Sequence, residues 1–252
     1  MGALVPHGGW RYSGRILAGT LRALAAARPN PDLLVVLGGH LDPGDPLRVF
    51  IEGRWATPLG PVPTPVALAE SVAMAQSAEP ETAEEYYDDS AVEVLMPALR
   101  YCWPDVSALV VGVPPDVDPG TLAREIHAEA EHRDYRAALV LGSVDLTHYG
   151  PDHCYRPRGH GEAAHSWVME DNDAALLEHA CRLEAHKVAW EGPRRRNTCS
   201  PGAAATALLL AKKLGATEGH VLAQSTSHLE GGEPRAPTSF VGYAGVLLGT
   251  AK

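Results

Sequence analysis

Runs of apolar residues alternate along this chain with stretches in which apolar residues return every three or four positions. The run DLLVVLGGH is continuously apolar up to its glycines, which is typical of a strand covered on both faces. Comparable runs predict further core strands, and one weaker run predicts an additional strand. The predicted core strands cover residues 3–5, 32–40, 106–114, 136–145 and 239–249, and the weaker strand covers 220–226.

Helical spacing fills the intervals between these runs. The first helix is expected to place Ile16, Leu17, Leu21 and Leu24 on one face and to end at the RPNP sequence. The Pro- and Gly-rich segment 42–63 predicts a short hairpin and a loop. The helices are expected at residues 14–27, 64–77, 90–102, 119–132, 161–190 and 201–214. This alternation predicts an α/β fold: one three-layer α/β/α domain over residues 1–252, with a central sheet that is mostly parallel or mixed.

Composition narrows the function classes. The 252 residues are 45% hydrophobic and 21% charged, which argues against disorder, and the formal net charge of −10 argues against a nucleic-acid partner. No apolar stretch approaches the roughly 20 residues of a membrane span, and the first residues lack a signal-peptide pattern. We therefore expect a cytoplasmic protein without a membrane partner. The four cysteines have no CxxC spacing and do not predict a disulfide framework.

Polar side chains follow three predicted strands at the points where the strands end. His7 follows the first strand, His40 follows the second, and the sequence SVDLTHYG places Asp145 and His148 after the strand at 136–145. Ligands of open α/β sheets bind outside the carboxyl ends of the strands, so these side chains are expected to share one site. Any one histidine taken alone is as well explained by hydrogen bonds to local backbone groups.

Cys199 is expected to reach the same site from the start of a helix. Ser200 is a good N-cap and Pro201 suits the first helical position, so the thiol lies at the positive end of the helix, where a thiolate is favoured. Such a thiolate could bind a metal ion or act as a nucleophile. The alternative, a small buried apolar side chain, suits Cys102 and Cys181 better.

The remaining candidates are weaker. Trp10, Tyr12 and Tyr149 either line an aromatic substrate pocket or pack beneath the loops, and Arg11 could pair with a substrate carboxylate. Three histidines are expected in a loop at the rim of the pocket, namely His153, His160 and His165. Four others are expected to face solvent: His127, His132, His179 and His186.

Six segments occur in an order that resembles the Memo family, also called AmmeMemoRadiSam system protein B. They are VPHGGWRYSG, VVLGGH, DDSAVEVLMPAL, GSVDLTHYG, NTCSPGA and SFVGYAGVLL, and they span about residues 5–248. The resemblance implies a fold similar to that of the class III extradiol dioxygenases, which hold Fe(II) with two histidines and a carboxylate. It implies that His7 and His40 are metal ligands, that Cys199 stands in the place of the carboxylate ligand, and that His148 is the acid–base residue beside Asp145.

The chain departs from the family pattern at two places. The turn LGGHLDPG is shorter than usual, and Asp89 stands where the family typically has His before Ser, so Asp89 is expected to give a different substrate contact.

The leading hypothesis is a non-haem oxygenase or oxidase that uses Fe(II) and O2 on a small aromatic or phenol-like metabolite, with His148, Asp145 and Cys199 as its catalytic residues. Because a thiolate is softer than a carboxylate, copper or zinc is also possible. One alternative is a protein that binds copper or a partner in the same pocket without catalysis. A third is a hydrolase in which Zn(II) activates water. The oligomeric state is left open.

Overall fold

The computed structural model describes residues 1–84, 86, 89–232 and 236–250. Within them, one nine-stranded sheet has the order β10-β11-β1-β8-β2-β7-β3-β6, with β9 paired to β11, and a separate hairpin joins β4 to β5. The strands are β1 (Gly2–Val5), β2 (Leu33–Gly38), β3 (Arg48–Phe50), β4 (Arg54–Trp55), β5 (Val62–Pro63), β6 (Glu79–Glu81), β7 (Ser107–Gly112), β8 (Ala138–Ser143), β9 (His148–Tyr149), β10 (Glu218–Thr226) and β11 (Phe240–Gly249).

The centre of the sheet is parallel and its borders are mixed. Strands β1, β8, β2 and β7 run parallel, while β11 is antiparallel to β1 and β3 is antiparallel to β7. Val5 lies opposite Ser143, and Leu37 lies opposite Gly142. The carboxyl ends of β1, β8 and β2 therefore meet at one edge of the sheet, and the residues that follow them are brought together.

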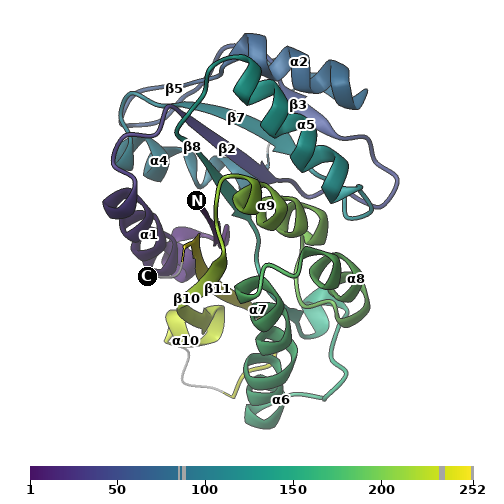
Figure 1. Ribbon diagram of the computed structural model, residues 1–252. Coiled ribbons are helices and arrows are strands. Elements are labelled where there is room, and N and C mark those ends of the chain that lie inside the picture. Colours follow the sequence, from purple (N-terminus) through teal and green to yellow (C-terminus); the bar gives the residue numbers. More distant parts are fainter. Residues whose placement is uncertain (85, 87–88, 233–235, 251–252) are drawn as a thin grey trace.

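Helices cover both faces of this sheet (Figure 1). They are α1 (Trp10–Ala27), α2 (Val66–Gln76), α3 (Ser90–Glu93), α4 (Met96–Cys102), α5 (Pro119–His132), α6 (Glu162–Trp167), α7 (Asp173–Cys181), α8 (Ala185–Arg195), α9 (Pro201–Lys213) and α10 (Ser227–Gly231). A 3-10 turn at Pro151–His153 and a π-helical turn at Val168–Asn172 complete the regular structure described.

Two apolar cores follow from the alternation of side chains along the strands. In β2, Leu33, Val35 and Leu37 pack with residues of α2, α5, α7, α8 and α9, whereas Leu34 and Val36 pack with residues of α1, α3 and α4. All six residues of β2 are buried. Successive side chains of a strand point to opposite faces, so the continuous apolar run in the sequence corresponds to a strand covered on both sides.

The predicted α/β fold with helices on both faces of a mixed sheet is confirmed, while the assignment of residues 1–252 to a single domain stays a prediction. All six predicted strands are present. The short strands β6 and β9 and the helix α10 were not predicted, because segments of two to five residues leave no detectable period.

Two predicted helices are divided in the structure. The helix expected at 90–102 consists of α3 and α4, because Pro97 lacks the N–H that a continuous helix requires and instead occupies the first turn of α4. The helix expected at 161–190 ends after Cys181, and the chain turns through Leu183, whose φ is 52°. Leu183 is 3% exposed, so burial of this side chain accompanies the turn between α7 and α8.

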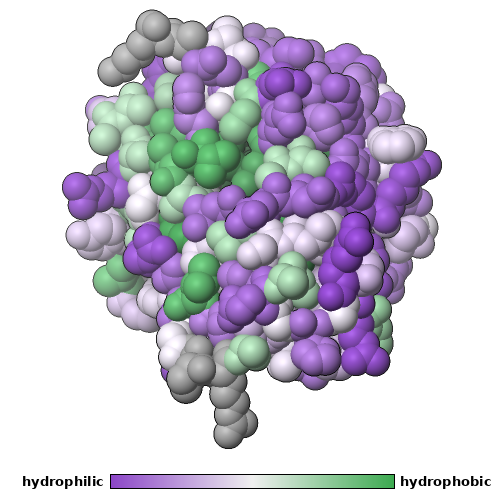
Figure 2. Space-filling model, turned by 90° about the horizontal axis from the view of Figure 1, so that it is seen from below, coloured by the Kyte–Doolittle hydropathy of each residue, from purple (hydrophilic) through white to green (hydrophobic). Residues whose placement is uncertain are grey.

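The surface seen from below is mostly hydrophilic, with a cluster of hydrophobic residues toward its upper left and smaller hydrophobic spots elsewhere (Figure 2). Among the described residues, no helix is both long enough and apolar enough to span a membrane. Most of the large apolar side chains lie inside the two cores.

Candidate functional site

The site is built on the loops that follow β1, β8 and β2. His7 and Asp145 come two residues after β1 and β8, which are neighbouring parallel strands. The carboxylate Oδ1 of Asp145 accepts hydrogen bonds from the backbone N–H groups of His7 and Gly8, at 2.8 and 3.3 Å. Asp145 thereby fixes the course of the loop that carries His7.

The imidazole of His7 is buried, and its two nitrogens have different surroundings. Nδ1 lies 3.1 Å from the Oγ of Ser143, whose hydroxyl donates to the backbone carbonyl of Ala91. Because that hydroxyl proton is already engaged, Ser143 accepts a hydrogen bond from Nδ1–H. This places Nε2 toward the interior of the site, 3.5 Å from the Sγ of Cys199 and 3.6 Å from the Oδ2 of Asp145.

Cys199 is held to the loop after β8 by reciprocal hydrogen bonds. Its N–H donates to the carbonyl oxygen of Asp145 at 3.1 Å, and the N–H of Asp145 donates to Sγ at 3.2 Å. Burial alone raises the pKa of this thiol, but the positive charge of His7, together with hydrogen bonding, outweighs that effect, so the pKa is lowered. The pKa of His7 is raised, because the charges of Cys199 and Asp145 outweigh the effect of its burial. Both shifts favour a thiolate–imidazolium pair in the protein without metal.

Ser200 occupies the N-cap position of α9, as predicted, but its side chain caps no helical N–H. Its Oγ instead donates to the carbonyl oxygen of Gly39 at 3.2 Å. This hydrogen bond to a distant loop replaces the local capping bond, and it connects the segment of Cys199 to the loop that carries His40.

His40 stands beside His7 and is oriented by Asp89. The two imidazole rings meet edge to face, with centroids 4.9 Å apart. The carboxylate of Asp89 lies 2.7 Å from the Nδ1 of His40 and accepts from the N–H of His40 at 2.9 Å and from that of Ala91 at 2.8 Å. Because the imidazole of His40 donates a hydrogen bond to the carboxylate of Asp89, the pKa of His40 is raised. Asp89 is thus the partner of His40, a role that the predicted substrate contact did not include.

His148 contributes a buried nitrogen without a hydrogen bond. Its Nε2 is inaccessible to solvent and forms no hydrogen bond within the described part of the chain. The Oδ2 of Asp145 lies 3.9 Å away, and the ring packs edge to face against His153 at 5.0 Å between centroids. Buried polar atoms are rarely left unpaired, so this nitrogen is available to a ligand or substrate proton.

The donor set has the chemistry of a transition-metal site. Both imidazoles use Nδ1 for a supporting partner, which is how metal-binding histidines are usually oriented, and the Nε2 of His7 contacts Cys199. Two ligands of one tetrahedral ion, at about 2.3 Å for sulfur and about 2.05 Å for nitrogen, stand about 3.5 Å apart. The separation between His7 Nε2 and Cys199 Sγ equals this value. In residues 1–84, 86, 89–232 and 236–250, however, no three His, Cys, Asp or Glu side chains form a ready metal-binding group.

Two pockets flank the cluster. One, of about 300 Å³, is lined by His148 and Cys199 and also by Arg196 and Leu146. Its other wall residues include four prolines, Pro43, Pro115, Pro193 and Pro201. The second, of about 330 Å³, lies on the side of His40 and Asp89. In the sequence, the short basic run 194–196 indicates either a solvated loop or a site for a small anion. The sequence analysis missed the prolines and Leu146; the only signal was that Pro193 comes shortly before Cys199.

None of the four predicted aromatic and basic substrate contacts lines these two pockets. Tyr149 is 0% exposed and stacks on Phe240, which is the alternative of packing beneath the loops. Trp10 is 56% exposed and donates its Nε1–H to the carbonyl oxygen of Val94. Arg11 lies over the ring of Tyr12, 5.6 Å from its centroid.

Three weaker assignments also need correction. His165 belongs to α6, not to a rim loop; it is buried, and its Nε2 lies 2.9 Å from the Oγ1 of Thr226. His179 does not face solvent freely but lies between Glu184 and Glu191, at 2.8 and 3.0 Å. Cys102 and Cys181 are half-buried and not fully buried.

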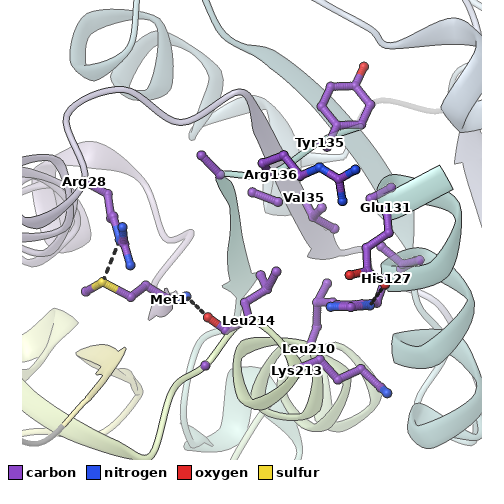
Figure 3. A pocket seen from close by; sticks show the side chains of 15 residues that line it. Met1, Arg28, Val35, His127, Glu131, Tyr135, Arg136, Leu210, Lys213 and Leu214 are labelled. Atoms are coloured by element: carbon purple, nitrogen blue, oxygen red, sulfur yellow. Dashed lines mark hydrogen bonds and ion pairs between the residues drawn. The ribbon is translucent and has the colours of Figure 1, made fainter. Parts of the chain in front are cut away.

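A further pocket, of about 340 Å³, lies at the other end of the strands (Figure 3). Met1, Arg28, His127 and Arg136 lie around it, and none of the candidate-site residues at the strand ends lines it. The candidate site at the carboxyl ends of the strands is therefore separate from this pocket.

Comparison with known proteins gives a family and a fold. Residues 1–247 match the family described as "Memo-like protein". A MEMO1 family protein of Thermococcus onnurineus is 26% identical over 97% of this chain and 85% of its own length, and one of Pyrobaculum arsenaticum is 29% identical over 98% and 83%. The crystal structure of an uncharacterized protein from Escherichia coli K12 superposes with a TM-score of 0.57 at 11% identity, over 91% of both chains.

Proposed function

Because the chain belongs to the Memo-like protein family, we propose that the cluster at the strand ends is the active site of a metal-dependent oxygenase or oxidase. The proposed substrate is a small aromatic or phenol-like metabolite that reacts with O2. The observation that carries the proposal is the convergence of His7 Nε2 and Cys199 Sγ, 3.5 Å apart, with the ring of His40 beside them and the unpaired Nε2 of His148 at the same site.

His7, His40 and Cys199 would hold the metal ion, proposed to be Fe(II). Two neutral imidazoles and one anionic ligand leave coordination positions open, and an Fe(II) ion bound there would bring substrate and O2 together and allow electrons to pass from the substrate to O2. Ser143 and Asp89 support the two imidazoles through their Nδ1 atoms. Asp145 fixes both the His7 loop and the Cys199 backbone, so it positions two of the three ligands.

His148 is assigned the proton transfer. A phenolic hydroxyl in the pocket next to Cys199 would lie beside His148, which lines the same pocket. Transfer of the phenolic proton to Nε2 would make the substrate anionic as it reacts, and Asp145 Oδ2 at 3.9 Å would stabilise the resulting imidazolium. Such acid–base help typically contributes about 100- to 10,000-fold to a rate.

Anaerobic loading with Fe(II), followed by measurement of O2 uptake with a panel of phenols, catechols and indoles, tests this function. We expect substrate-dependent uptake by the wild-type protein. His148→Ala should lose at least about 100-fold of the rate while binding Fe(II) as before. His127→Gln, a histidine substitution at the distant pocket, is the matched control and should keep full activity. No uptake with any compound by fully loaded protein would refute the oxygenase proposal.

Copper binding without turnover is the second candidate. It is favoured by the thiolate of Cys199, because a soft sulfur ligand in place of a carboxylate suits Cu(I). One Cu(I) bound per chain, lost in Cys199→Ser and accompanied by no O2 chemistry, would select this function over the first.

A further inference from the structure

Arg196 stands at the wall of the pocket that also contains His148 and Cys199. It follows the last residue of α8 and has a φ of 49° and a ψ of 40°, a left-handed conformation that residues other than glycine rarely adopt. The turn at Arg196 directs the chain from α8 toward Cys199, three residues later. The guanidinium and the thiolate thus reach one pocket from the same short segment.

The guanidinium of Arg196 is held only by neutral groups. Its Nη1 donates to the carbonyl oxygen of Cys154 at 3.2 Å and its Nη2 to that of His153 at 3.1 Å. Its Cζ also lies 4.7 Å from the centroid of the Tyr155 ring. A guanidinium has five N–H donors, so these two bonds fix its position and leave donors for a ligand.

The neighbouring arginines are engaged differently. Arg195 forms ion pairs with Asp171 and Glu191. Among the ion pairs of the described residues, none involves Arg196. Arg196 is exposed, so water screens its charge, but no carboxylate in the described part of the chain pairs with it, although the protein as a whole carries a formal net charge of −10. An immobilised guanidinium without a carboxylate partner, at the wall of a pocket, has the properties of an anion-binding group.

The rest of the pocket gives the ligand its shape. Prolines and Leu146 form much of the wall, and His148 and Cys199 supply the reactive groups. The pocket is about 300 Å³, which suits a small molecule. A ligand that satisfies all these groups is a flat, apolar ring with a hydroxyl near His148 and an anionic group at Arg196.

We propose that Arg196 is a specificity-determining residue that binds the carboxylate of a hydroxylated aromatic acid. This inference rests on the proposed function, because it names the substrate class of the same site. Arg196 binds and orients the acid and takes no part in proton transfer.

Binding to the metal-free protein tests the inference without reference to activity. Calorimetric titration would compare para-hydroxybenzoate with para-hydroxybenzamide, which has the same shape and no charge. We expect the wild-type protein to prefer the acid, and Arg196→Gln to weaken acid binding about 10- to 100-fold while leaving amide binding unchanged. Arg196→Lys, which keeps the charge but loses the planar fork, should recover part of the affinity.

Arg194→Gln is the matched control. Arg194 is two residues away, stacks on Trp190 and does not line the pocket, so the same charge change there should leave acid binding unaltered. Equal binding of acid and amide by the wild-type protein would overturn the inference, as would equal losses in Arg194→Gln and Arg196→Gln. Unfolding midpoints of both variants establish that they are folded.

The two proposals can fail separately. Acid binding that depends on Arg196, without O2 uptake by iron-loaded protein, would keep the anion site and reject the oxygenase. O2 uptake that is equally fast with neutral phenols, and unchanged in Arg196→Gln, would keep the oxygenase and reject the role of Arg196.

Discussion

The thiolate character of Cys199 can be measured directly in the metal-free protein. The pKa of this thiol is lowered to about 6, chiefly because the His7 charge opposes the effect of burial. At pH 6.5 a thiol with this pKa is about three-quarters ionised, whereas an ordinary thiol with a pKa near 8.5 is about 1% ionised. The lower basicity of such a thiolate reduces its intrinsic reactivity about 10- to 18-fold, so Cys199 should react about four- to eightfold faster than an ordinary thiol.

The perturbation is His7→Gln. It removes the positive charge and the hydrogen bond of His7, which both lower the thiol pKa. Burial and Asp145, which raise this pKa, remain, and so does the hydrogen bond with His148, which lowers it. The thiol pKa should therefore rise toward its ordinary value, and the reaction at pH 6.5 should slow about four- to eightfold. The pH profile is the clearer sign: the wild-type rate should level off above about pH 7, and the variant rate should still increase at pH 9.

The assay is the release of thiopyridone from dithiodipyridine, followed by absorbance after removal of metal with a chelator. Because Cys154 is exposed and would react as well, both proteins should carry Cys154→Ser. Cys102 and Cys181 are half-buried and burial raises their pKa values, so they react slowly at pH 6.5. A wild-type rate that climbs through pH 8–9 as an ordinary thiol does, or identical profiles for wild type and variant, would refute the thiolate–imidazolium pair.

Three other outcomes are expected. Asp89→Asn should weaken metal binding about 10- to 100-fold, because the imidazole of His40 loses the carboxylate that orients it. Competition with a coloured chelator measures the metal affinity. Asp118→Asn, which changes a carboxylate at the N-terminus of α5, is the control and should leave metal binding unchanged. Gly202→Ala should lower the free energy of unfolding, measured in urea, by about 1–3 kcal/mol, because the added Cβ would overlap a backbone carbonyl oxygen. Gly19→Ala places its Cβ in open space on a helix and should raise the free energy of unfolding by about 0.5–1 kcal/mol. Equal effects of the two substitutions would contradict this prediction. Burial raises the pKa of Asp173 in the folded protein to about 7, above its value in the unfolded chain. The free energy of unfolding of the wild type relative to Asp173→Asn should therefore decrease as the pH rises from about 4 to 7. A difference that does not change with pH, measured by urea unfolding over this range, would contradict the raised pKa.

The fold class and the main strands and helices of the sheet could be predicted from the order of residues alone. Apolar runs such as DLLVVLGGH can lie only where both faces of a strand are covered, and in the structure successive residues of β2 enter the two different cores. Because carboxyl ends of parallel strands meet at one edge, the same pattern also indicated that His7 and Asp145 would lie close together, as they do.

Only the tertiary structure decided how each side chain is used. The orientation of His7 depends on Ser143 and the backbone of Ala91, and that of His40 depends on Asp89, contacts between segments about 50 to 140 residues apart in the chain. The pocket wall is likewise made of prolines and Arg196 from two loops, the end of α8 and the start of α9. Tyr149, adjacent to His148 in sequence, packs instead in a small separate apolar cluster with Phe240. Local periodicity carries no information on such contacts, because they arise from packing between elements and not from the spacing of residues within one.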